Sequence, residues 1–142
     1  MKALALALLL PTAAMADPDR IFILAGSHHI GTEYDFQEVN PGMFLTWERQ
    51  TFDFTFGGYV NSYGMGSVAA SVAYPIARGE DWSIDVFAGL ATYFGTTNPD
   101  IVPMAGLQSR YGPVFAQYVP VPGGQYIDGL VSFGLTFPVG PR

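Results

Sequence analysis

The sequence contains no cysteine, few charged residues and very few basic ones. Without cysteine, thiol nucleophiles, disulfides and thiolate metal sites are excluded. Charged residues make up 13% of the chain, whereas a typical soluble domain has about 25%. Six Lys and Arg stand against twelve Asp and Glu, for a net charge of −6, which is the wrong sign for binding a nucleic-acid backbone. Any reactive group must therefore come from histidine, serine, tyrosine or carboxylates.

Long apolar runs are also missing, and the longest one lies at the start of the chain. Residues 1–16 begin with Met1-Lys2, continue through ALALALLL and end in Ala-Met-Ala. This order predicts a cleaved export signal, because a transmembrane helix needs about 20 apolar residues. We expect residues 17–142 to form one mature domain. Its low charge and 15% aromatic content favour the outer membrane of a Gram-negative bacterium over the periplasm or the medium.

Apolar residues in the mature chain recur with a period of two, which is typical of β-strands. Residues 82–93 are an example, with the apolar face Trp82, Ile84, Val86, Ala88 and Leu90. Turn residues divide the chain into eight such runs, which we expect at 20–28, 38–48, 52–62, 67–77, 82–94, 102–110, 113–121 and 128–138. Strands of about 9–11 residues match the smallest transmembrane barrels. We therefore predict an all-β, eight-stranded antiparallel up-and-down transmembrane β-barrel.

The connections between these strands alternate in length. Short turns follow the second, fourth and sixth strands, whereas 29–37, 95–101 and 122–127 are longer connections at the other end. Short periplasmic turns and longer outer loops are typical of outer-membrane barrels. All basic residues of the mature chain then lie at the periplasmic end: Arg20, Arg49, Arg78, Arg110 and Arg142. Because the first and third strands run outward, we expect His28, His29 and residues 59–64 to meet at the outer rim.

The expected interior allows two interpretations. Eight strands enclose room only for side chains or one small ligand, so we do not expect a water channel. The expected inner face alternates glycines with bulky residues, namely Phe22, Leu24, Phe44, Phe87 and Leu130. Such a lining could form a slot for an acyl chain, or it could simply fill the barrel, as in other small barrels.

Three prolines lie near the outer ends of the sixth and seventh expected strands: Pro103, Pro120 and Pro122. Proline lacks the N–H group that a strand ladder needs and belongs at edges or strand ends. Because these prolines face one another across one strand pair, they predict a lateral opening toward the membrane. The simpler interpretation is that they only end two strands.

Several motifs, taken in order, resemble the lipid A palmitoyltransferases of Gram-negative outer membranes. His29 is followed by Glu38 and "NPG", the third expected strand ends in "VNSYG", and "YGPV" separates two strands that carry proline. The resemblance is distant and covers residues 27–137. It implies a barrel with an internal acyl pocket and prolines that gate lipid entry. The family transfers a palmitoyl chain from a phospholipid to a hydroxyacyl chain of lipid A.

By position, the resemblance implies that His29, Asn61 and Ser62 form the catalytic group. His29 would be the general base that takes the proton of the acceptor hydroxyl. Ser62 and Asn61 would orient groups or stabilise the developing oxyanion. The family has Asp where this chain has Asn61, and an amide supplies no charge to an imidazolium. His29 then needs Glu33, Asp35 or Glu38 as a partner, or activity is reduced or lost.

Other interpretations of these residues stay open. His28 and His29 also fit ordinary rim residues, and a metal site is disfavoured because adjacent histidines do not easily share one ion. Glu33, Asp35 and Glu38 could be a solvated loop or could hold Ca²⁺ or Mg²⁺ that bridges to lipopolysaccharide phosphates. We expect no cofactor, no nucleic-acid partner and a monomer. The competing functions are a non-enzymatic structural or lipid-binding barrel and a soluble lipocalin-like binder.

Overall fold

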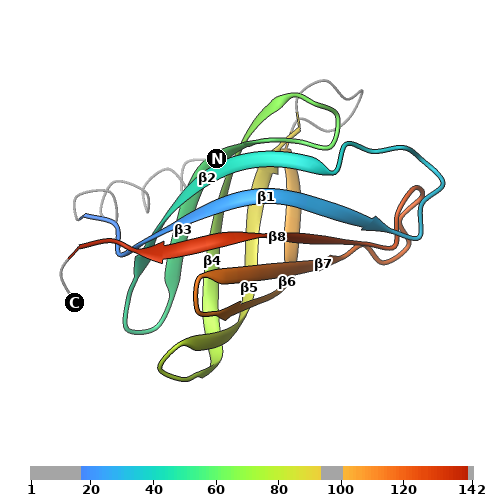
Figure 1. Ribbon diagram of the computed structural model, residues 1–142. Coiled ribbons are helices and arrows are strands. Elements are labelled where there is room, and N and C mark those ends of the chain that lie inside the picture. The colour runs from blue at the N-terminus through green and yellow to red at the C-terminus, as the bar shows by residue number, and fades with distance from the viewer. Residues whose placement is uncertain (1–16, 94–100, 141–142) are drawn as a thin grey trace, which may run out of the picture.

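The computed structural model describes residues 17–93 and 101–140, which form a closed antiparallel barrel (Figure 1). Each strand pairs with the next along the chain, and β1 closes the barrel against β8. The predicted eight-stranded antiparallel barrel is confirmed. Its strands are β1 (Arg20–Ile30), β2 (Val39–Glu48), β3 (Asp53–Val60), β4 (Gly66–Arg78), β5 (Trp82–Thr92), β6 (Ile101–Tyr111), β7 (Val114–Pro120) and β8 (Gly129–Pro138).

Three expectations fall on parts of the chain that the structure does not describe. The export signal at residues 1–16, Arg142 and most of the connection at 95–101 lie outside the described residues. Within the described part of the chain, no helix is long and apolar enough to cross a membrane.

Side chains alternate between the interior of the barrel and its outer surface, as the period of two predicts. Along β5, Ser83, Asp85 and Phe87 are buried, whereas Trp82 and Ile84 are exposed. Large apolar side chains are exposed on every strand, among them Ile23, Met43, Phe56, Val72, Val86, Leu107, Val114 and Leu135. The apolar outer surface therefore belongs to a sheet that has no free edge, because the strands have closed on themselves.

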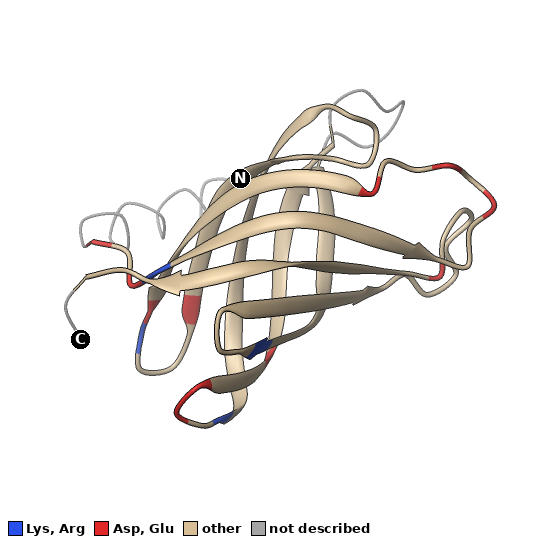
Figure 2. Cartoon of the chain, viewed as in Figure 1, with Lys and Arg blue, Asp and Glu red and all other residues tan. Residues whose placement is uncertain are grey.

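The two ends of the barrel differ in their connections and in their charge. We call the end formed by connections 31–38, 61–65 and 121–128 the loop end, and the end formed by 49–52, 79–81 and 112–113 the turn end. All four described arginines lie at the turn end (Figure 2). In the described connections at the loop end, the charged side chains are all acidic. These acids are Glu33, Asp35, Glu38 and Asp128.

The ladder between β6 and β7 is short and stops well before the loop end. It pairs only five residues of each strand, from Tyr111↔Val114 to Leu107↔Tyr118. Beyond Leu107, β6 continues to pair with β5 as far as Ile101. Extending the register past Leu107↔Tyr118 would set Pro103 opposite Pro122, with Pro120 two residues nearer the ladder. The three prolines thus border the unpaired parts of these two strands.

Paired charges occupy the interior at the turn end. Glu48 on β2 accepts hydrogen bonds from Arg20 at 3.0 Å and from Arg110 at 3.1 Å, which ties β2 to β1 and to β6. Arg78 at the end of β4 binds Asp53 on β3. The same guanidinium lies 3.7 Å from Asp85, which is on β5 and only 2% exposed. The first group connects β1, β2 and β6, and the second connects the neighbouring strands β3, β4 and β5.

Apolar side chains fill the middle of the barrel, as expected for its inner face. Phe22, Leu24 and Phe115 form a buried cluster, against which Phe44 and Tyr59 pack. A cavity that the described residues form beside them has a volume of about 90 Å³. Small-molecule sites usually measure about 300–1,000 Å³, so the interior is mostly filled by its own side chains.

Candidate functional site

His29 and Ser62 meet at the loop end of the barrel. His29 lies in β1, one residue before the strand ends, and Ser62 lies in the connection after β3. The Nε2 atom of His29 is 2.8 Å from the Oγ atom of Ser62, so the two groups share a hydrogen bond. The predicted meeting of these residues at one rim is confirmed. His29 belongs to the strand, however, and not to the first loop.

A β-bulge in β1 turns His29 toward the interior. Phe22 and Leu24 are buried, so strict alternation would place His28 inside and His29 outside. The pairing of β1 with β8 shifts between Leu24 and Gly26, where β1 has one extra residue, and this residue exchanges the two faces. The side chain of His28 is 66% exposed, whereas His29 is only 7% exposed. The bulge thus decides which histidine enters the site.

The imidazole of His29 is held on one side by Phe36, a residue that the sequence did not single out. The two rings stack with centroids 4.5 Å apart and planes at 24°. The Nδ1 atom of His29 is buried and has no hydrogen-bond partner in the described structure. If Nε2 donates its proton to Ser62, a neutral ring keeps a lone pair on Nδ1. One nitrogen is then available to a ligand or to a transferred proton.

The three acids proposed as partners of His29 do not bond to its ring. Glu38 lies 2.9 Å from Nδ1 of His28 and also accepts a 3.4 Å hydrogen bond from the backbone N–H of His29. Asp35 lines the same cavity as His29, and Glu33 is not among the residues that line it. The aromatic stack with Phe36 and the bond to Ser62 therefore set the ring orientation without a carboxylate.

Asn61 builds the turn that carries Ser62. Its side-chain oxygen accepts hydrogen bonds from the backbone N–H groups of Tyr63 at 2.9 Å and Met65 at 3.1 Å. Its amide group donates to the Oγ atom of Ser67 at 3.0 Å, and the residue is only 1% exposed. Asn61 thus positions Ser62 through the turn, which is a role that the resemblance did not imply.

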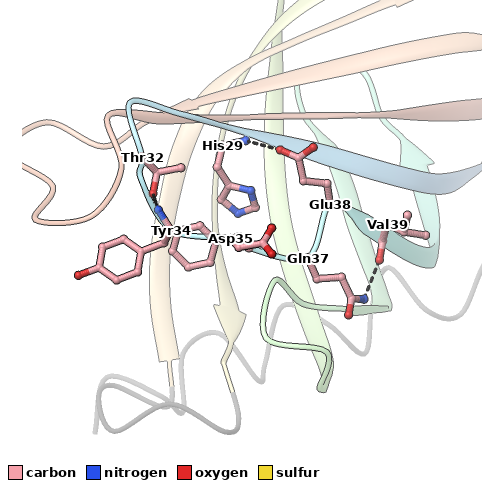
Figure 3. A pocket seen from close by; sticks show the side chains of 8 residues that line it. His29, Thr32, Tyr34, Asp35, Gln37, Glu38 and Val39 are labelled. Atoms are coloured by element: carbon pink, nitrogen blue, oxygen red, sulfur yellow. Dashed lines mark hydrogen bonds between the residues drawn. The ribbon is translucent and has the colours of Figure 1, made fainter.

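A cavity of about 430 Å³ opens beside His29 at the loop end (Figure 3). All of its lining residues except His29 and Val39 come from the connection between β1 and β2. They are His29, Thr32, Tyr34, Asp35, Phe36, Gln37, Glu38 and Val39. Figure 3 shows the imidazole of His29 between the backbone of β1 and the side chains of this connection. His29, whose Nδ1 atom has no partner among the described residues, therefore lines a cavity with polar and aromatic walls.

Metal-binding residues do not gather in the described part of the chain, where no group of three or more His, Asp or Glu could hold an ion. Comparison with known proteins adds no assignment to this geometry. No protein-family model matches the chain, and no curated protein matches it significantly.

Proposed function

We propose that the chain is an outer-membrane acyltransferase-like barrel that moves a fatty acyl chain from a phospholipid to lipid A. The observation that carries this proposal is the hydrogen bond between His29 and Ser62, together with the unpartnered Nδ1 atom of the same ring. A histidine whose Nε2 atom is held 2.8 Å from a hydroxyl, and whose other ring nitrogen has no partner among the described residues, can act as the general base of acyl transfer.

In this proposal Ser62 accepts the N–H of Nε2 and so leaves Nδ1 of His29 as the basic nitrogen. The acceptor hydroxyl attacks the ester carbonyl of the donor phospholipid, and its proton passes to Nδ1. When the tetrahedral intermediate collapses, the lysophospholipid oxygen leaves and takes that proton back. The new ester joins the acyl chain to the acceptor, and the base returns to its starting form.

The exposed apolar surface of the strands supports a membrane location for this reaction. In lipid, every backbone group must find a partner within the protein, which a closed barrel achieves. The unpaired parts of β6 and β7 form an exception, and they contain Pro103 and Pro120, two of the prolines that the resemblance associates with lipid entry. A lipid chain that enters between these strands would pass from the membrane through the barrel wall into the interior.

The small interior cavity favours a second candidate, a barrel without enzymatic activity that serves a structural or lipid-binding role. A volume of about 90 Å³ is too small for a long acyl chain unless side chains such as Phe22 and Phe87 move. Among the described residues no carboxylate bonds to the ring of His29, which points the same way, because such a group stabilises the imidazolium that forms during catalysis.

The test is the mass spectrum of lipid A from a Gram-negative host that lacks acyltransferases of its own. We expect the native chain to add the mass of one acyl chain, and His29→Ala to reduce this addition by about 10²–10⁴-fold, the range of a lost general base. Both variants must show the heat-modifiable gel mobility of a folded barrel. Equal acylation by His29→Ala would clear His29 of the proposed role, and no acylation by either chain would favour the non-enzymatic candidate.

A further inference from the structure

In the described part of the loop end, the connections offer only negatively charged side chains to an approaching lipid headgroup. Its described connections contain Glu33, Asp35, Glu38 and Asp128 but neither lysine nor arginine. A headgroup with a net negative charge is repelled by such a rim, whereas a headgroup that carries an ammonium group can be attracted to it.

Two of these acids line the cavity beside His29, and aromatic rings line it with them. Asp35 and Glu38 contribute carboxylates, and Tyr34 and Phe36 contribute rings whose centroids are 6.0 Å apart. Carboxylates accept the hydrogen bonds of an ammonium group, and aromatic faces attract cations. The cavity therefore combines the two kinds of groups that recognise an organic cation.

A second observation indicates that this cavity receives a ligand. His29 lines the same cavity, is 7% exposed, and has at Nδ1 a buried nitrogen without a hydrogen-bond partner in the described structure. Buried polar atoms in native proteins nearly always have partners. The missing partner at Nδ1 is consistent with a polar group that arrives from the cavity.

We propose that this cavity binds the ammonium group of a zwitterionic phospholipid, and that the acyl donor is of this class and not an anionic phosphatidylglycerol. The assignment of the bound lipid as donor depends on the proposed function, whereas the binding preference can be measured without it. Asp35 and Glu38 hold the ammonium group, and the glycerol esters then lie on the side of the cavity where His29 meets the barrel mouth. The loop end selects the donor phospholipid by the charge of its headgroup, before an acyl chain passes between β6 and β7.

Native mass spectrometry of the purified barrel in detergent tests this directly. The probes are phosphatidylethanolamine and phosphatidylglycerol with identical acyl chains, in equal amounts, at low ionic strength and with EDTA. We expect phosphatidylethanolamine adducts to exceed phosphatidylglycerol adducts about tenfold, which corresponds to about 1.4 kcal/mol. The double variant Asp35→Asn with Glu38→Gln should bring the ratio to within about twofold.

Glu33→Gln is the matched control, because it removes a charge from the same connection without touching the cavity. It should keep most of the preference, and N-acetylated phosphatidylethanolamine should lose it because its ammonium group is gone. Equal binding of the two headgroups by the native chain would overturn the proposal. So would an effect of Glu33→Gln as large as that of the double variant, or a preference that appears only with added Mg²⁺ in place of EDTA.

The lipid A assay separates this inference from the proposed function. A headgroup preference without acylation of lipid A would leave the binding site standing and remove the transfer reaction. Acylation without a preference would keep the enzyme and reject the ammonium site.

Discussion

At the residue scale, two side chains that the sequence presents as equivalent take opposite roles. His28 and His29 are adjacent, but the bulge in β1 sends the first to the surface, where it meets Glu38, and the second to Ser62. Gly26 allows this bulge, because a Cβ at its position would lie 2.5 Å from the backbone oxygen of Glu38. The candidate site therefore depends on one glycine and one extra residue.

Asn61 allows a prediction at the same scale. Asn61→Ala should lower the free energy of unfolding by about 2–3 kcal/mol, because the N–H groups of Tyr63 and Met65 lose the acceptor that the buried side chain of Asn61 gives them. Urea unfolding in detergent, followed by tryptophan fluorescence, measures this loss. Asn61→Asp is the control: its carboxylate can accept both bonds and can also accept the hydroxyl proton of Ser67, so its stability should stay close to that of the native chain. Equal losses in both variants would contradict this account of the turn.

The sequence predicted the barrel closely because its period of two is an averaged property of many residues. No expected strand boundary differs from the observed one by more than two residues. The roles of single side chains were harder to predict, because they depend on register. A bulge is visible only when two strands are paired, so the inward direction of His29 could not be read from alternation. The stack with Phe36 and the turn contacts of Asn61 depend on loop geometry for the same reason.

At the scale of elements, the incomplete ladder between β6 and β7 suggests a test of lipid entry. Ala105 and Pro120 would face each other if the register continued, and both lie on the outer surface beyond the last pair. A disulfide between Ala105→Cys and Pro120→Cys should close the wall at this point. We expect oxidation to lower acyl transfer at least about tenfold and reduction to restore it, because the lipid would have to cross a closed strand pair. The lipid A mass spectrum before and after reduction gives the result.

The chain provides a control for this disulfide that shares one of its positions. Ala105 pairs with Ala88 in the continuous ladder between β5 and β6. A disulfide between Ala88→Cys and Ala105→Cys should leave transfer unchanged, and the native chain contributes no competing thiol. Loss of transfer in both oxidised variants would show a general loss of flexibility and would reject β6–β7 as the entry route.

At the scale of the whole molecule, the separation of charge predicts how the barrel is oriented. If the chain is the proposed outer-membrane barrel, the loop end should face outward and the arginine-rich turn end should face the periplasm. Glu33→Cys should react with a membrane-impermeant maleimide on intact cells. Glu80→Cys, at the turn end, should react only after the outer membrane is permeabilised. The reverse pattern, or equal labelling of both variants, would exclude this orientation.

The ion pairs of Glu48 with Arg20 and Arg110 should contribute more to stability than ion pairs on the surface do. Glu48→Ala should lower the free energy of unfolding by about 2–3 kcal/mol, because it leaves Arg20 and Arg110 without their shared carboxylate in the lumen. Arg49→Ala removes an exposed pair with Asp19 and should cost less than about 1 kcal/mol. Urea unfolding of the two variants under one set of conditions compares them, and similar losses would show that the lumen is as well hydrated as the surface.

The shared carboxylate also has a consequence for how the protein is assembled. Glu48 and Arg110 are 62 residues apart, and four strand-to-strand steps lie between them. Arg110 on β6 reaches this carboxylate only when β6 meets β2, and until then it is an uncompensated cation, which is costly in hydrocarbon. Hairpins that form early should therefore stay at the membrane–water interface, and the protein should insert into the bilayer only when the barrel is nearly closed.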